Sequence, residues 1–129
     1  MSNKVLVVTA KKGALANDRR VLANVSAATA APTLSSDGDF LNRIEYLHLL
    51  FKLTNTDSSN SCTFYVQVWW WSAITDMWHK GEMLKVNDND IHTIENQGLN
   101  RIYLQVTQKV YGGSTTPTLD AWVGMVVPV

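Results

Sequence analysis

Apolar and polar residues alternate along most of the chain from residue 43 onward, in runs that turn-forming residues interrupt. The alternation is plainest in the runs RIEYLHLLFKLTN, CTFYVQVWWW, RIYLQVTQKV and LDAWVGMVVPV. Successive side chains of a strand point to opposite sides, so a period of two is typical of strands with one buried face. Stretches rich in Asn, Asp, Ser and Gly separate these runs, as turns and loops do.

The connecting stretches predict how the strands follow one another. SAITD is expected to form a hairpin loop, with MWHKGEMLKV returning as the next strand. A short strand is expected at residues 91–94, and KVLVVTA near the N-terminus adds another. The total of about seven or eight strands, with turns roughly every ten residues, predicts an all-β antiparallel sandwich.

One face of each alternating run is expected to fill the core of this sandwich. These inward positions are Leu47, Leu49, Phe51, Leu53, Phe64, Val66, Val68, Trp70, Ile102, Leu104, Val106, Val110, Leu119, Ala121, Val123, Met125 and Val127.

The first part of the chain differs in composition from the rest. Residues 1–39 contain no aromatic residue, and SAATAAPTLSSDGD is small and polar. We therefore expect residues 1–39 to form an N-terminal arm or edge strands and residues 40–129 to form the sandwich, within one domain overall. The stretch NDRRVLANVSAATAA fits a short helix that ends at a proline, and its RRVLANVSA portion also alternates as a strand.

Four of the five tryptophans lie between Tyr65 and Leu84, and three of them are consecutive. Trp70 shares a face with the core residues, so Trp69 and Trp71 must point the other way. Trp78, across the SAITD turn, is expected to lie beside one of them as a cross-strand pair.

Three interpretations of this second aromatic face stay open. A loop, the other layer or the N-terminal segment can cover it, or it can be a subunit interface, where aromatic residues are enriched. It can also be a platform on which sugars stack, with Tyr65 and Gln67 as polar neighbours.

Charge narrows the class of partner. Eleven basic and eleven acidic residues give a net charge of zero, and 17% of the 129 residues are charged. A nucleic-acid partner would require a basic excess, so none is expected. A charged fraction below the usual ~25% favours assembly with other proteins, because fewer ions lose their hydration. The basic pairs Lys11-Lys12 and Arg19-Arg20 are candidates for attachment to a larger lattice.

No motif for catalysis or cofactor binding is present. The single cysteine, Cys62, cannot form an intramolecular disulfide, and its apolar surroundings are expected to raise the pKa of its thiol. The three histidines lack metal-ligand spacing. Asp88 and Asp90 lie in a polar stretch without the glycine of a calcium-binding loop, so a solvated turn is favoured over a calcium site. We expect no enzyme activity and no cofactor.

The N-terminus carries an apolar run of about five residues, which is too short for a signal peptide. No stretch approaches the length of a membrane span, so no membrane association is expected. The chain is expected to be made in the cytoplasm.

The Trp-rich hairpin VQVWWWSAITDMWHKGEML, the strand GLNRIYLQVTQKV and the C-terminal LDAWVGMVVPV resemble small structural proteins of tailed-phage virions. The closest type is the jelly-roll head-decoration or cement protein, and the resemblance covers roughly residues 40–129. It implies a homotrimer seated on the lattice of the major capsid protein, with an N-terminal arm that grips the capsid or a neighbouring subunit.

Sequence alone therefore favours a virion structural protein that works by binding. The face with Tyr65, Gln67, Trp69, Trp71 and Trp78 is the candidate interface or ligand site. The alternative is a carbohydrate-binding module or lectin, for which the partner is a glycan.

Overall fold

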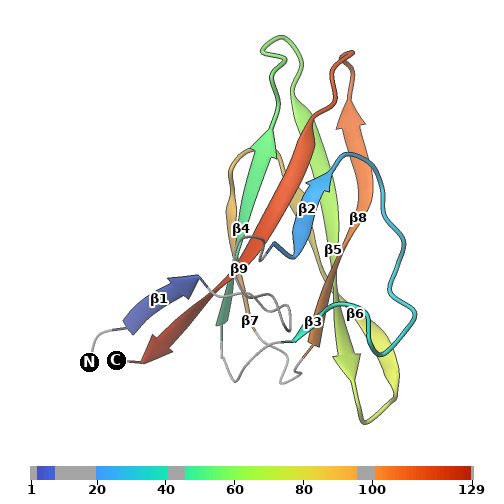
Figure 1. Ribbon diagram of the computed structural model, residues 1–129, viewed down its shortest axis with the longest axis vertical. Coiled ribbons are helices and arrows are strands. Elements are labelled where there is room, and N and C mark those ends of the chain that lie inside the picture. Colours follow the sequence, from blue (N-terminus) through green and yellow to red (C-terminus); the bar gives the residue numbers. More distant parts are fainter. Residues whose placement is uncertain (1–2, 8–19, 41–45, 96–100, 129) are drawn as a thin grey trace.

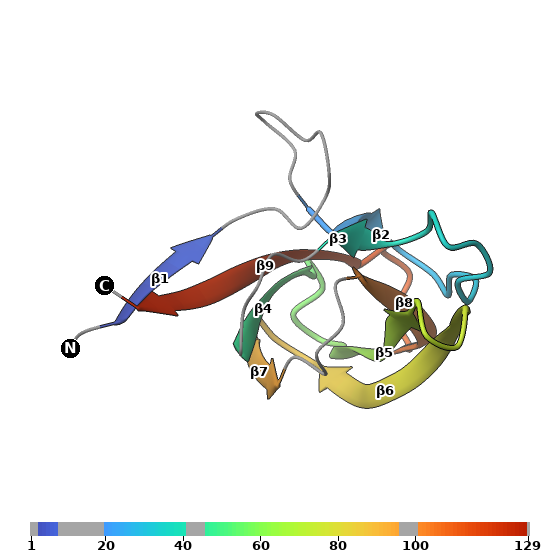
Figure 2. The same ribbon diagram turned by 90° about the horizontal axis from the view of Figure 1, so that it is seen from below.

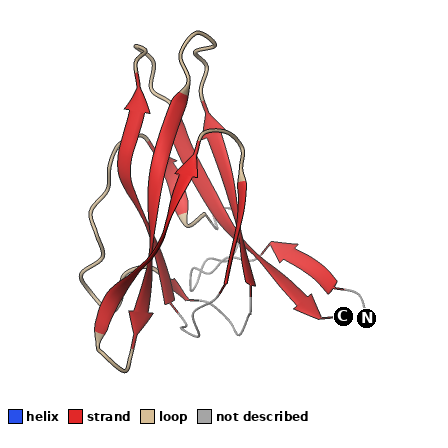
Figure 3. Ribbon diagram, turned by 180° about the vertical axis from the view of Figure 1, so that it is seen from behind, coloured by secondary structure: helices blue, strands red, loops and turns tan. Residues whose placement is uncertain are grey.

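Two antiparallel sheets pack face to face in this protein. The computed structural model describes residues 3–7, 20–40, 46–95 and 101–128. The described residues form strands and no helix (Figure 3). The predicted all-β antiparallel sandwich is therefore confirmed. The strands are β1 (Asn3–Val7), β2 (Leu22–Val25), β3 (Asp39–Phe40), β4 (Tyr46–Thr54), β5 (Cys62–Ser72), β6 (Met77–Val86), β7 (Ile91–Glu95), β8 (Arg101–Tyr111) and β9 (Thr118–Pro128).

The chain changes sheet at most of its connections. The first sheet has the order β1-β9-β4-β7, with β2 also paired to β9, and the second has the order β3-β8-β5-β6 (Figure 1). Without the terminal β1 and the two-residue β3, seven strands make up the sandwich, four in one sheet and three in the other. This agrees with the seven or eight strands that the sequence predicts.

The inner faces of the two sheets form the core that the alternation predicts. Leu49 and Phe51 of the first sheet meet Phe64, Val66 and Val68 of the second. The remaining buried members of this core include Trp70, Ile102, Leu104, Val106, Leu119, Ala121 and Val123. Leu53 is partly buried against them, and the side chains of Leu47, Met125 and Val127 lie outside the described part of the structure.

Val110 departs from its predicted inward position, because its side chain is 48% exposed. The cause is a shift in strand register. Tyr65 pairs with Gln108 but the next residue, Val66, pairs with Val106, so Thr107 is an extra residue in β8. One inserted residue turns every later side chain to the opposite face. Tyr111, the next residue along β8, packs against the core instead.

The N-terminal part contributes to both sheets. β2 pairs with the inner half of β9 through Leu22↔Ala121 and β3 pairs with the start of β8, so from Arg20 onward the strand alternative is the one observed. β1 pairs with the outer half of β9, from Val7↔Gly124 to Asn3↔Pro128. Figure 2 shows this two-stranded ribbon projecting from the body of the sandwich, with both chain ends beside each other.

The described part of the chain contains no helix with the length and apolar character that a membrane span requires.

Candidate functional site

The strand β5 divides its tryptophans between the two faces of the second sheet. Trp70 points into the core and is 3% exposed, as the sequence predicts. Its neighbours Trp69 and Trp71 lie on the outer face and are partly buried. The alternation of the strand thus sends two indoles away from the interior that the sandwich shares.

A row of aromatic rings crosses this outer face from strand to strand. Trp71 pairs with Trp78 of β6, which confirms the predicted cross-strand pair. Their ring centroids are 5.6 Å apart, and the Trp78 ring lies 6.0 Å from that of Tyr103 on β8. Both pairs meet edge to face, the arrangement that the ring quadrupoles favour.

A segment of the N-terminal region, residues 29–37, lies across these rings, and we refer to it as the strap. Its first residue bonds to the free edge of β8, since Thr29 N donates to Val106 O at 2.8 Å and Thr29 Oγ1 accepts from Val106 N at 3.0 Å. Two aromatic side chains of the sheet then hold the strap from below. Tyr103 OH donates to Ala30 O and Trp78 Nε1 donates to Leu34 O, both at 2.9 Å.

The strap buries Trp78, which is only 9% exposed. It also raises the pKa of Tyr103, mainly through burial and secondarily through the nearby Asp37 carboxylate, so the phenol remains a hydrogen-bond donor. The interpretation in which the N-terminal segment covers the aromatic face is therefore observed for Trp78. The cover is incomplete at Trp69 and Trp71.

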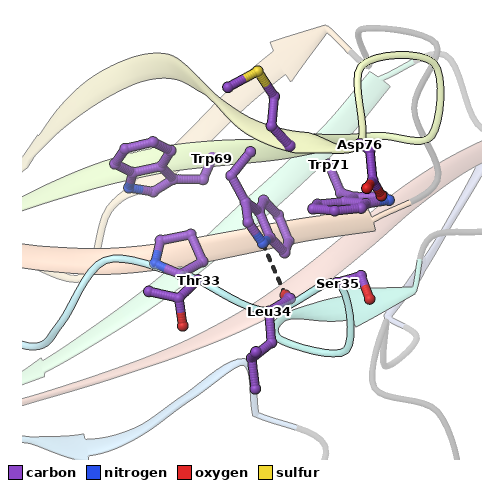
Figure 4. Close-up of a pocket in the computed structure, with 9 residues that line it drawn as sticks. Thr33, Leu34, Ser35, Trp69, Trp71 and Asp76 are labelled. Atoms are coloured by element: carbon purple, nitrogen blue, oxygen red, sulfur yellow. Dashed lines mark hydrogen bonds between the residues drawn. The ribbon is translucent and has the colours of Figure 1, made fainter.

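Between the strap and these two tryptophans lies an open groove of about 420 Å³. Figure 4 shows Thr33, Leu34 and Ser35 of the strap on one side and Trp69 and Trp71 on the other. We call this hollow the aromatic groove, and its lining residues are Pro32, Thr33, Leu34, Ser35, Trp69, Trp71, Asp76, Met77 and Trp78.

The indole of Trp69 is held in place from two sides. Its Nε1 donates to Gln105 Oε1 at 2.9 Å, and the ammonium of Lys80 lies 5.6 Å from its ring centroid. A ring that is hydrogen-bonded at its edge and covered by a cation has little freedom left to lose when a ligand binds.

Among the described residues that line the groove, Asp76 is the one with a charged side chain. It belongs to the tight turn between β5 and β6, and its φ of 55° is in the left-handed region. Aspartate and asparagine adopt this conformation more readily than most residues, because their short side chains bond locally. The turn thus explains why an acid stands at this end of the groove.

Gln67, predicted as a polar neighbour on the outer aromatic face, is buried, with only 7% of its surface exposed. A register shift between Gln67 and Trp69 leaves two residues of β6, Gly81 and Glu82, opposite a single position of β5. Gln67 Nε2 lies 2.9 and 3.1 Å from the carbonyl oxygens of these two residues. Its amide thus satisfies the bulge and is withdrawn from the groove. Tyr65 is partly buried and does not line the groove either.

The proposed attachment residues have different positions. Lys11, Lys12 and Arg19 lie outside the described residues. Arg20 Nη1 contacts Asp120 Oδ1 at 2.6 Å, and the same oxygen accepts from Asn24 N. Arg20 therefore joins the start of β2 to β9, and its role in attachment to a lattice stays a prediction.

The remaining candidate chemistry is dispersed. Cys62 is buried, and burial raises the pKa of its thiol, as expected. Asp88 Oδ1 accepts from Asn89 N and Asp90 Oδ2 accepts from Asn87 N, as in a turn. Among the described residues, no three metal-binding side chains come together.

The strap side of the groove could not be identified from the sequence. Residues 32–35 appeared only as part of a small, polar stretch. The signals available in the sequence were Pro32 and the Asp37-Gly38 pair. These residues predict a turn, but they do not predict that the segment crosses a sheet.

Comparisons with protein families, with curated proteins and with solved structures found no match to this chain.

Proposed function

We propose that this chain is a structural protein of a tailed-phage virion, a decoration or cement protein of jelly-roll fold that forms a homotrimer and binds the major capsid protein. It works by binding, without catalysis or a cofactor.

The order of the strands is the observation that carries this proposal. From β2 to β9, strands β2, β4, β7 and β9 lie in one sheet and β3, β5, β6 and β8 in the other. In space they follow the orders β2-β9-β4-β7 and β3-β8-β5-β6. A jelly roll, built from eight strands in two Greek keys, would have such an order, so the order supports the proposed fold, which is common in viral capsid proteins.

The fold also occurs in lectins, so a second feature must favour assembly. The ribbon of β1 and the end of β9 supplies one. Its sequences NKVLV and GMVVP contain consecutive apolar residues, as strands covered on both faces do. A two-stranded ribbon by itself is only marginally stable in water. A second copy of the chain or the capsid surface can provide such cover.

Light scattering on the purified chain at micromolar concentration tests the self-association. We expect a mass three times the 14.4 kDa of one chain, and a variant without residues 1–7 should dissociate while its circular dichroism remains that of a β protein. A full-length chain that stays monomeric would contradict the trimer.

The virion location has its own test. Mass spectrometry of purified particles of the phage that encodes the chain should detect it at a copy number comparable to that of the capsid lattice sites. Its absence from intact particles would overturn the proposal.

A further inference from the structure

We propose that the aromatic groove binds an uncharged pyranose sugar, as one or two units of an oligosaccharide. This inference is independent of the assembly proposed above, because it uses the second sheet and not the terminal ribbon.

The shape of the groove suits such a ligand. Its volume of about 420 Å³ lies within the ~300–1,000 Å³ typical of small-molecule sites. The groove is open to the surface, so a chain of sugars can extend beyond it. Trp78 forms its buried floor, and the partly exposed rings of Trp69 and Trp71 form one wall. Indole faces attract the C–H face of a pyranose through dispersion and burial of apolar surface.

The groove is also organised before a ligand arrives. Trp69 Nε1 and Trp78 Nε1 each donate to an acceptor of the chain itself, Gln105 Oε1 and Leu34 O. Asp37 Oδ2 accepts from the backbone N–H groups of Thr33 and Leu34, which fixes the opposite wall. Binding therefore costs little ordering of side chains or backbone, which raises affinity for a given contact.

The polar groups around the rings select the type of ligand. Thr33, Ser35 and Asp76 line the same groove, and their side chains carry hydroxyl and carboxylate groups of the kind that bond to sugar hydroxyls. Of the groove-lining residues that the structure describes, none is a lysine or arginine, and the Lys80 ammonium lies 5.6 Å from the centroid of the Trp69 ring. A nucleobase carried on a phosphate backbone, or an acidic sugar, would bring a negative charge close to the Asp76 carboxylate in the lining. A neutral sugar avoids this repulsion.

The experiment is a titration with soluble neutral oligosaccharides, followed by tryptophan fluorescence and confirmed by calorimetry. The panel consists of cello-, malto- and chito-oligosaccharides of three to six units, with oligogalacturonate as the acidic comparison and a proline-rich peptide as the rival ligand. We expect saturable binding of at least one neutral series and none of oligogalacturonate.

Two variants locate the site. Trp71→Ala should weaken binding about tenfold, because it removes one stacking face. Asp76→Asn should weaken it about threefold to tenfold, and asparagine keeps the left-handed backbone, so the turn should still fold. Trp122→Ala is the matched control, since Trp122 is a partly buried indole of β9 on the other sheet. It should leave the affinity unchanged.

Three outcomes would overturn the proposal. These are no binding of any neutral oligosaccharide at millimolar concentration, equal loss of binding in the Trp122 control, and saturable binding of the peptide in its place. Dissociation of an oligomer by Trp71→Ala would assign the groove to a subunit interface instead. Because the terminal ribbon is intact in all three variants, failure here leaves the trimer and virion tests unaffected.

Discussion

Two loops of this sandwich use an aspartate in the same way and reach opposite results. In the strap, Asp37 Oδ2 accepts from Leu34 N at 2.8 Å and from Thr33 N at 2.9 Å. In the loop between β4 and β5, Asp57 Oδ1 accepts from Ser59 N at 2.9 Å and its Oδ2 from Asn60 Nδ2 at 2.8 Å. Each carboxylate thus closes its own turn.

The difference lies in what each loop meets across the space beside it. Asp57 Oδ2 also accepts from Tyr111 OH of β8 at 2.8 Å, and Thr115 shares a bond with the same phenol. That loop is therefore tied directly to the neighbouring hairpin through its own aspartate. The strap is tied to its sheet through Trp78 below it, and the side toward Trp69 and Trp71 stays open. A loop that is fixed in place leaves an open groove beside it only where the contacts that fix it do not also fill that space.

The largest effect is expected from removing the support of the strap. Trp78→Ala deletes a buried ring that contacts two other aromatic rings and leaves Leu34 O without its donor. Truncation of a large buried aromatic residue costs about 3–5 kcal/mol of unfolding free energy. Urea unfolding measures this loss. Ile74→Ala, at a turn residue that is 93% exposed, is the control and should stay within about 0.5 kcal/mol of the parent. A small effect of Trp78→Ala would mean that the strap is held elsewhere.

A smaller effect is expected from loosening the closed loop. Tyr111→Phe removes the hydroxyl that joins Asp57 to Thr115 and should lower the unfolding free energy by about 1 kcal/mol. Tyr65→Phe removes a hydroxyl from a partly buried tyrosine of the same sheet and provides the comparison. Equal effects of the two substitutions on urea unfolding would show that the Asp57 contact contributes nothing specific.

The smallest effect is expected from acid. Hydrogen bonds lower the pKa of Asp37, mainly from Leu34 N, and that of Asp57, mainly from Asn60, below the usual 3.8. A carboxylate whose pKa is lower in the folded state stabilises the fold at pH values above its usual pKa. This contribution is lost as the pH falls through the folded-state pKa. Amide hydrogen exchange at Leu34 and Ser59 should therefore become faster below about pH 4, when each rate is compared with the intrinsic rate of the same amide in an unstructured peptide at that pH.

The acid response can be assigned with two substitutions. Asp37→Asn should abolish the pH dependence at Leu34 alone, and Asp57→Asn that at Ser59 alone. A change at both positions in either variant would show global unfolding instead of two local responses.

The sequence predicted those parts of the fold that depend on local alternation. The inward position of Trp70, the pairing of Trp71 with Trp78 and the buried face of β4 all follow from a period of two and one tight turn. The burial of Gln67 and the exposure of Val110 could not be predicted, because a bulge depends on how two strands pair and leaves no local pattern.

The groove depended on information of a third kind. Its wall at Trp69 and Trp71 follows from the strand, whereas the opposite wall at residues 32–35 depends on where a polar connection lies in space. That path is set by distant partners such as Tyr103 and Val106 on β8, more than seventy positions along the chain. Attachment to a lattice remains a prediction for Lys11, Lys12, Arg19 and Arg20, because it depends on the surface of another molecule.

The pairing of β1 with the end of β9 has a mechanical consequence. Asn3 and Pro128 are opposite one another at the outer end of the ribbon, and Val7 and Gly124 at the inner end. A force that pulls the two ends apart would load these pairs one after another, beginning at the tip, and would peel the ribbon open like a zipper. The sandwich would bear tension only after the last pair had separated. The ribbon would therefore open first, while the fold behind it stayed intact.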